Sequence, residues 1–179
     1  KSRVVVVGDG QMGLVMADGL AHGGHDTVVW GPFEEHVDEL ATSRCSTRLP
    51  GFVLDDSIQV MAEPSAALAG ADLVVCAIPC QFIRPVFKRL APFIKGEPTL
   101  VSVAKGLEIG TLLRPTEILS EQLAPGASST RPVASVFWND VLLSAKRLEA
   151  DGRPERLDAR IDRARHLDRR EFAARVGGD

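Results

Sequence analysis

Short aliphatic runs alternate along this chain with longer stretches in which apolar residues recur every three or four positions. The runs, such as the four valines at positions 4–7, predict strands that are buried on both faces of a parallel sheet. The longer stretches predict helices, because parallel strands need crossover connections. We expect strands at residues 3–7, 27–30, 58–61, 73–78, 99–103 and 132–136. We expect helices at residues 11–22, 34–42, 64–69, 81–93 and 112–123.

This alternation predicts an α/β fold with a Rossmann-like, doubly wound and mostly parallel sheet. The carboxyl ends of the strands then meet at one edge of the sheet, where ligands of open α/β folds bind. The alternation stops in the last part of the chain, where residues 147–179 hold nine arginines, eight acidic residues and no lysine. We expect a dinucleotide-binding domain over residues 1–136 and a divergent arginine-rich tail over residues 137–179. For the tail, a solvated helix after Pro154 and a disordered segment both stay open.

The first predicted strand leads into glycines at positions 8, 10 and 13, which is G-x-G-x-x-G spacing. In a dinucleotide-binding loop, Gly8 allows the tight turn, Gly10 lets the backbone approach a pyrophosphate, and Gly13 lets the helix pack close to the strand. The N–H groups of Gln11, Met12 and Gly13 then attract the anion at the positive end of the helix dipole. A turn without a ligand and a site for S-adenosylmethionine are the alternatives.

Asp9 stands between the first two of these glycines and brings a negative charge close to the expected pyrophosphate. In a partly wet site the repulsion amounts to about 1 kcal/mol or more, so we expect this side chain to point away from the anion, into solvent. The second predicted strand is followed by Gly31 and Pro32, and not by an acid for a ribose hydroxyl or an arginine for a 2′-phosphate. NAD and NADP therefore both stay open. Phe33 is a candidate to cover the adenine and Glu34 to reach a ribose hydroxyl, and ordinary positions at the start of a helix stay open for both.

Composition and charge narrow the possible partners. A formal net charge of -3 and a pI near 5.8 provide no basic surface for nucleic acid or anionic lipid. No apolar run approaches the roughly 18 residues of a membrane span, and no signal-peptide pattern is present. The three cysteines lack paired C-x-x-C spacing, which favours a reducing compartment, and we expect a cytoplasmic protein.

Histidines and cysteines are the remaining residue types that could carry chemistry. His22 and His25 have no neighbouring acid or cysteine cluster that would complete a metal site, so we expect no metal. Cys76 lies within an aliphatic run and is expected in the core. Cys80, just past the end of that run, is a candidate for an accessible thiol.

Five segments together resemble the N-terminal domain of NAD(P)-dependent glycerol-3-phosphate dehydrogenase in their order and spacing. They are VVVVGDGQMG, VVWG, RLPGFVLDDSI, ALAGADLVVCAIPCQFIRPVF and LVSVAKGLE, and the resemblance extends from Arg3 to about Val136. It implies an oxidoreductase that uses NAD or NADP to interconvert glycerol 3-phosphate and dihydroxyacetone phosphate. The partner it implies is a small phosphorylated substrate.

The resemblance also implies roles at the glycine loop. Gly8, Gly10 and Gly13 match the family's pyrophosphate glycines. Gln11 and Met12 stand where the family usually has a Ser/Asn–Trp pair, so the bulky aromatic residue is missing.

Further roles follow for two loops beyond the glycine loop. Pro79 and Phe82 match a loop near the nicotinamide, and Lys105 matches a lysine that contacts cofactor and substrate. Independently of the family, an ammonium just past the carboxyl end of a strand can attract a substrate phosphate. A core position for Phe82 on an amphipathic helix, and an ordinary solvated position for Lys105, stay open as alternatives.

The chain departs from the family after PVASV. There the family has a Ser-Gly-Pro-Ser motif and then a helical domain that carries the general-base lysine, whereas this sequence reads FWNDVLLSAKRLEADGRP. We therefore expect no catalytic residue in this chain and no activity of the chain alone, and a truncated or frame-shifted coding sequence is one hypothesis for the tail. Two other functions stay open: a non-catalytic dinucleotide-binding module, and the first domain of another two-domain dehydrogenase, such as a ketopantoate-reductase-like enzyme. A homodimer stays open as well.

Overall fold

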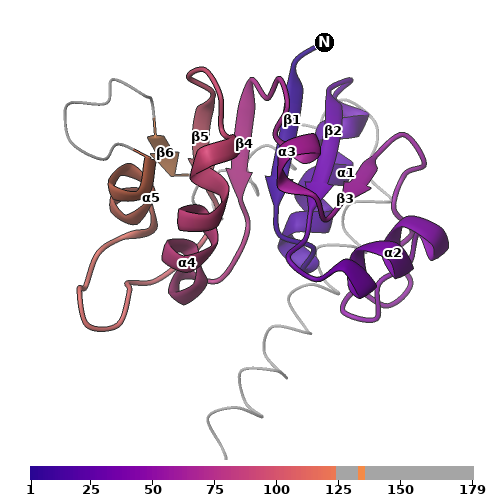
Figure 1. Cartoon of the computed structure of the whole chain (residues 1–179). Helices are drawn as coiled ribbons and strands as arrows, with labels where there is room; N and C mark the ends of the chain where they lie inside the picture. Colours follow the sequence, from indigo (N-terminus) through magenta and orange to yellow (C-terminus); the bar gives the residue numbers. More distant parts are fainter. Residues whose placement is uncertain (124–132, 136–179) are drawn as a thin grey trace, which may run out of the picture. The chain divides into compact units, whose positions relative to one another are not determined.

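The valine-rich segment Arg3–Val7 forms β1, an interior strand of a six-stranded parallel sheet (Figure 1). The computed structural model describes residues 1–123 and 133–135. The other strands are β2 (Asp26–Trp30), β3 (Gln59–Met61), β4 (Leu73–Cys76), β5 (Thr99–Ser102) and β6 (Val133–Ser135). Their order is β3-β2-β1-β4-β5-β6, and every neighbouring pair is parallel. The direction of winding reverses between β1 and β4, which makes their carboxyl ends the topological switch point.

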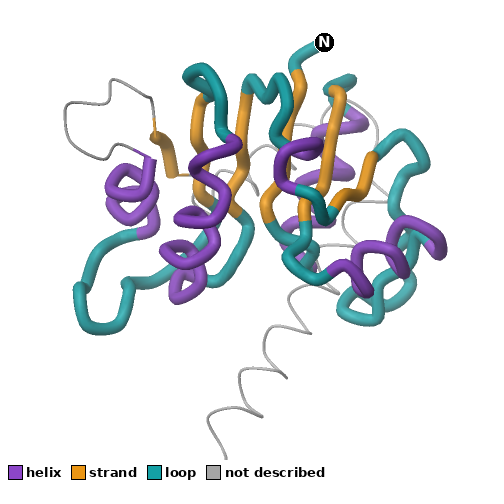
Figure 2. Tube along the Cα trace, in the orientation of Figure 1, coloured by secondary structure: helices purple, strands orange, loops and turns teal. Residues whose placement is uncertain are grey.

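Helices cover both faces of this sheet (Figure 2). They are α1 (Gln11–His22), α2 (Glu34–Ser43), α3 (Pro64–Ala67), α4 (Cys80–Leu90), the 3₁₀ turn η1 (Ala91–Phe93) and α5 (Pro115–Leu123). Because side chains alternate along a strand, Val7 of β1 joins one core with Phe87 of α4 and with residues of α3 and α5. Val6 joins the opposite core with Leu14 of α1 and Leu40 of α2. The two-sided burial explains why β1 is aliphatic at every position from 4 to 7.

The register of the sheet brings three strand ends together. Val7 is paired with Trp30 on one side and with Cys76 on the other. Gly8 N–H donates to the Trp30 carbonyl at 2.8 Å, and Ala77 N–H donates to the Val7 carbonyl at 2.9 Å. The loops after β1, β2 and β4 therefore leave the sheet at one common edge.

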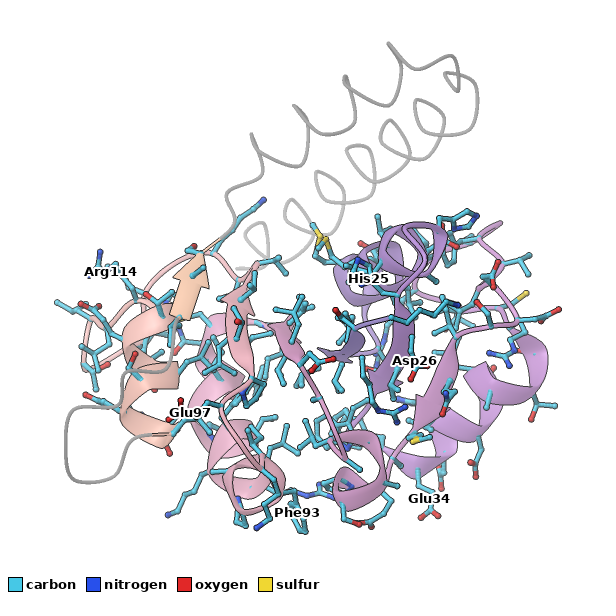
Figure 3. All side chains as sticks on the ribbon, turned by 90° about the horizontal axis from the view of Figure 1, so that it is seen from above. His25, Asp26, Glu34, Phe93, Glu97 and Arg114 are labelled. Carbon is cyan, nitrogen blue, oxygen red and sulfur yellow. The ribbon has the colours of Figure 1, made fainter. Side chains whose placement is uncertain are left out.

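At the opposite edge of the sheet, an ion pair joins the amino ends of neighbouring strands. Arg3 Nη1 donates to Asp26 Oδ2 at 2.7 Å, and Asp26 can be followed in Figure 3 at the start of β2. Asp72 Oδ2, just before β4, accepts from the Arg3 backbone N–H at 2.8 Å. These contacts fix the amino ends of three neighbouring strands and leave the carboxyl edge for ligand chemistry.

The predicted fold class is confirmed, and the differences lie at the ends of elements. β4 ends at Cys76 instead of residue 78, and α5 begins at Pro115 instead of residue 112. Leu112 has φ of 59°, a left-handed conformation that cannot belong to an α-helix, whereas proline is well suited to a first helical position. α4 ends at Leu90, because Pro92 has no N–H to continue the helix and the chain forms a 3₁₀ turn there.

Not every expectation falls on described residues. The chain divides into two units, Lys1–Val136 and Phe137–Asp179. The second unit, with the alternatives considered for the segment after Pro154, lies outside the described residues. Of the helices in residues 1–123, none has the length and apolar character needed to cross a bilayer.

Candidate functional site

The loop after β1 requires glycine at two positions. Gly8 has φ of 128°, and a β-carbon there would lie 2.8 Å from the Ala77 carbonyl oxygen. A β-carbon on Gly13 would lie 1.9 Å from the Gly8 carbonyl oxygen, so only glycine lets α1 pack this close to β1. Gly10 differs, because no described residue other than its two chain neighbours comes within 4 Å of a β-carbon placed on it. The expected turn and close packing are thus confirmed, and Gly10 borders open space.

The start of α1 directs backbone donors toward this space. Gly10 is the N-cap residue, and its carbonyl accepts the first helical hydrogen bond, from Leu14 N–H at 3.0 Å. The N–H groups of Gln11, Met12 and Gly13 precede this bond and lie at the positive end of the helix dipole. The first turn contains no acidic residue that would neutralise them. Loop and helix end together have the shape and the polarity that a diphosphate needs.

Asp9 does not point into solvent, and this expectation was wrong. Its side chain is only 11% exposed, and Oδ1 lies 3.2 Å from Nη1 of Arg48. The carboxylate lies beside Gly31, the first residue after β2, since a β-carbon on Gly31 would come within 3.2 Å of Asp9 Cγ and Oδ2. The ion pair and the absence of a side chain at Gly31 explain why a carboxylate is tolerated in this position.

A pocket of about 410 Å³, part of it open to solvent, adjoins Asp9. It is lined by Asp9, His36, Glu39, Leu40 and residues 45–48. Arg48 Nη2 lies 3.4 Å from His36 Nδ1, and the ring of Phe33 meets the His36 ring edge-on at 5.5 Å between centroids. Phe33 is the N-cap residue of α2 and is 59% exposed. The structure thus brings Phe33 to the same side of the glycine loop as the pocket.

Pro79 and Phe82 lie on the other side of the switch point. Pro79 is the N-cap residue of α4, and its carbonyl accepts from Phe82 N–H at 2.9 Å. Phe82 is 58% exposed, so the alternative of a core aromatic is wrong for this residue. The core positions of α4 are Cys80, Ile83, Phe87 and Leu90. An exposed aromatic ring therefore stands at the carboxyl edge, on the side where the nicotinamide was expected.

Lys105 lies in the loop after β5 and is exposed. Gly106, the next residue, has φ of 91° and forms a bend directly after the lysine. The loop is tied to α4 by the Gln81 side chain, whose Nε2 donates to the Leu107 carbonyl at 2.8 Å. The same amide accepts from Ile109 N–H at 2.9 Å.

A second contact with α4 supports this loop. The guanidinium of Arg84 binds the Glu108 carboxylate through Nε and Nη2, both at 2.8 Å, and Thr111 Oγ1 donates to the same carboxylate. The residue Glu108 is 8% exposed. The hydrogen bonds from Arg84, then that from Thr111, hold the pKa of Glu108 below its usual range. Sequence reasoning assigned no role to Gln81, Arg84 or Glu108, although all three stand within the segments that carry the family resemblance.

The cysteines are in part as expected. Cys76 is buried, and burial raises the pKa of its thiol to about 12. Cys80, the candidate for an accessible thiol, is only 5% exposed, because it forms the first, inward-facing position of α4, and burial raises its pKa as well. Among residues 1–123 and 133–135, no group of three histidine, cysteine or acidic side chains is arranged to hold a metal ion.

Comparison with known proteins identifies the domain. The family model described as the N-terminus of NAD-dependent glycerol-3-phosphate dehydrogenase matches residues 3–133. The chain belongs to this family. Glycerol-3-phosphate dehydrogenase (NAD(P)+) 2 of Lactobacillus delbrueckii subsp. bulgaricus is 36% identical over 122 residues, which make up 68% of this chain and 36% of that protein.

Solved structures share the fold. The structure of glycerol-3-phosphate dehydrogenase from Coxiella burnetii has a TM-score of 0.64 at 24% identity and covers 69% of this chain and 38% of its own. A PanE/ApbA family ketopantoate reductase from Ralstonia eutropha has a TM-score of 0.54 at 19% identity over 75% of this chain and 40% of its own. The likeness to either structure shows a common fold alone. The resemblance to glycerol-3-phosphate dehydrogenase is confirmed by the family match, and the chain spans 36% of the length of the curated relatives it matches first.

Proposed function

We propose that this chain binds NAD or NADP as the cofactor-binding part of an NAD(P)-dependent glycerol-3-phosphate dehydrogenase. The proposal is carried by the glycine loop, where α1 begins against the end of β1 and its first N–H groups border the open space at Gly10. Membership in the glycerol-3-phosphate dehydrogenase family supports the same assignment. When bound, the nicotinamide supplies the hydride chemistry that interconverts glycerol 3-phosphate and dihydroxyacetone phosphate.

Residues along the carboxyl edge of the sheet are assigned to different parts of the bound nucleotide. Gly8, Gly10 and Gly13 shape the loop, and the N–H groups of Gln11 and Met12 contribute to binding the pyrophosphate. On the β2 side, Phe33 contacts the adenine; on the β4 side, Pro79 and Phe82 border the nicotinamide. Lys105 attracts the phosphate of the substrate and contacts the cofactor, since this residue follows the carboxyl end of β5 in the chain. The exposed rings of Phe33 and Phe82 support this assignment.

The proposal leaves the general base outside the matched domain. None of the described residues is assigned that role, and the relatives are much longer than the matched region. The substrate, a small phosphorylated molecule, therefore meets only Lys105 among the residues assigned here. Binding of a dinucleotide without turnover is the second function compatible with this division of labour.

Location and assembly form part of the proposal. A cytoplasmic location is supported by the three cysteines, all of which are free thiols. Assembly into a homodimer is proposed from the family resemblance, and light scattering coupled to size-exclusion chromatography tests it directly. A mass twice the 19.2 kDa of the chain is the expected result, and a single-chain mass contradicts it.

Titration calorimetry of the 179-residue chain with NADH and with NADPH tests nucleotide binding. Gly10→Ala adds a methyl group that no atom of the described chain opposes, at a φ of -81° that alanine adopts freely. We expect this variant to fold and to bind nucleotide about tenfold more weakly or worse, because the methyl occupies the approach to the loop. Gly19→Ala is the matched control, since Gly19 is an exposed glycine of α1 with equally open surroundings.

The outcomes separate the possible functions. A chain that binds neither nucleotide at millimolar concentration contradicts the proposal. Oxidation of NADH on addition of dihydroxyacetone phosphate identifies an active dehydrogenase. Binding without this oxidation identifies a dinucleotide-binding domain that requires further residues for turnover.

A further inference from the structure

The Asp9 carboxylate, from the loop after β1, lies at the end of β2, where this fold usually has an acid that belongs to the second strand itself. In dinucleotide-binding α/β folds, an acid at the end of the second strand binds the adenosine ribose, and an arginine nearby accommodates a 2′-phosphate. Here β2 is followed by Gly31 and Pro32. Asp9 Oδ2 lies 3.2 Å from the position of a Gly31 β-carbon, so the glycine loop itself supplies a carboxylate at the end of β2.

Arg48 completes the arrangement from a distant part of the chain. It lies 39 residues after Asp9, between α2 and β3, and its Nη1 is 3.2 Å from Asp9 Oδ1. The Gln11 side chain donates to the Arg48 backbone carbonyl, which attaches this segment to the start of α1. Arg48 is 45% exposed, whereas Asp9 is 11% exposed. The arginine is therefore accessible from the pocket, and the aspartate depends on it as a partner.

The charges in the pocket favour a ribose with a free 2′-hydroxyl, as in NAD, over a ribose with a 2′-phosphate, as in NADP. Asp9 and Glu39 contribute two carboxylates to the lining and Arg48 contributes one guanidinium, with His36 beside it. A ribose 2′-hydroxyl can donate a hydrogen bond to Asp9 while the ion pair stays intact. A 2′-phosphate carries close to two negative charges and has to draw Arg48 away, which leaves a largely buried carboxylate unpaired beside an anion.

We infer that the Asp9–Arg48 pair makes this site selective for NAD(H) over NADP(H). Asp9 accepts from the ribose hydroxyl and holds Arg48, and Arg48 is the group that binds a 2′-phosphate once Asp9 loses its charge. The inference deepens the proposed function and rests on it, because it concerns the same nucleotide. Curated relatives are named as NAD(P)+ enzymes, so family membership does not decide between the two cofactors, and the inference rests on this chain's own residues.

The experiment compares dissociation constants for NADH and NADPH at fixed pH and salt. The wild type is expected to bind NADH about tenfold more tightly or better, and Asp9→Asn is expected to shift the ratio toward NADPH by about tenfold or more, a change of about 1.4 kcal/mol. Asparagine keeps the size of the side chain and releases Arg48. In Asp9→Asn/Arg48→Gln the gain in NADPH affinity is expected to disappear. Asp38→Asn, on the exposed face of α2, is the matched control and should leave the ratio unchanged.

Adenosine 5′-diphosphate and its 2′-phosphorylated form, 2′-phosphoadenosine 5′-diphosphate, repeat the comparison without the nicotinamide. The same shift with these two fragments supports assignment to the ribose site. A wild type that prefers NADPH, or a ratio that Asp9→Asn leaves unchanged in a folded protein, overturns the inference while the proposed function stands. Failure of the wild type to bind any of the four nucleotides overturns the proposed function itself.

Discussion

A β-carbon on Gly13 would lie 1.9 Å from the carbonyl oxygen of Gly8. This distance means that the first turn of α1 rests directly on the backbone that leaves β1. The same contact places the N–H groups at the start of α1 over the end of the strand, where the pyrophosphate is expected. The packing of α1 against β1 and the expected binding of the pyrophosphate therefore both depend on the absence of a side chain at Gly13.

Gly13→Ala should destabilise the domain by about 3 kcal/mol or more, because the opposing atom belongs to the backbone and cannot rotate away. Urea unfolding followed by far-ultraviolet circular dichroism measures the change. Gly19→Ala, in the same helix but with no neighbour within 4 Å of the added carbon, should instead stabilise by about 0.5–1 kcal/mol. Equal effects of the two substitutions would contradict the packing described for Gly13.

Lys105→Ala should weaken NADH binding by about tenfold to a hundredfold, the loss expected when a charge-assisted contact of about 1.5–3 kcal/mol is removed. Calorimetry measures the affinity, and a melting curve establishes that the variant is folded. Lys88→Ala is the control, since Lys88 is also exposed but lies in the last turn of α4, away from the carboxyl edge. If both lysines changed affinity equally, Lys105 would act only through overall charge.

Local sequence carries most of the fold and the glycine loop. The aliphatic run at residues 4–7 predicts a central strand because burial on both faces leaves no position for a polar side chain. The spacing of Gly8 and Gly13 predicts the turn and the contact between helix and strand, because both features involve residues that are close together in the sequence. The helix end at Leu90 could have been placed more closely, since Pro92 is visible in the sequence.

Contacts between residues that are distant in the sequence could not be predicted from local patterns. Asp9 was expected in solvent because a carboxylate is repelled by the pyrophosphate, and nothing close in sequence indicated that Arg48 reaches it from 39 residues away. The ion pair that supports the Lys105 loop also joins residues that are distant in sequence, since Arg84 and Glu108 lie 24 residues apart. Which acid meets which arginine is decided by the way the α2–β3 segment and the α4 helix return to the sheet edge, and local patterns do not encode this.

Glu108 should make stability depend on pH. Its pKa is lowered in the folded protein by hydrogen bonds from Arg84 and then Thr111, so its contribution is present above the ordinary glutamate pKa and is lost as pH falls through the lower folded value. Glu108→Gln should therefore be less stable than the wild type at pH 7, and the difference should narrow progressively below about pH 4.5. Urea unfolding at a series of pH values measures both proteins. A difference that stays constant across this range would contradict the role of the charge.

Thiol labelling should report on the fold and on the pocket together. Cys45 is exposed and lines the pocket beside Asp9, whereas Cys76 and Cys80 are buried. The thiolate is the reactive form, and with a pKa of about 12 only about one Cys76 thiol in ten thousand is ionised at pH 8. Ellman's reagent should therefore label one thiol per folded chain rapidly and all three after unfolding.

Saturating NADH should slow the rapid reaction, because a nucleotide bound at the end of β2 covers the pocket that Cys45 lines. Cys45→Ser should abolish the rapid phase and so assigns it. Adenosine, which lacks the diphosphate that the glycine loop binds, serves as the ligand control and should protect far less at the same concentration. Rapid labelling of Cys45 at an unchanged rate in saturating NADH would place the adenosine end of the nucleotide elsewhere, away from Asp9 and Arg48.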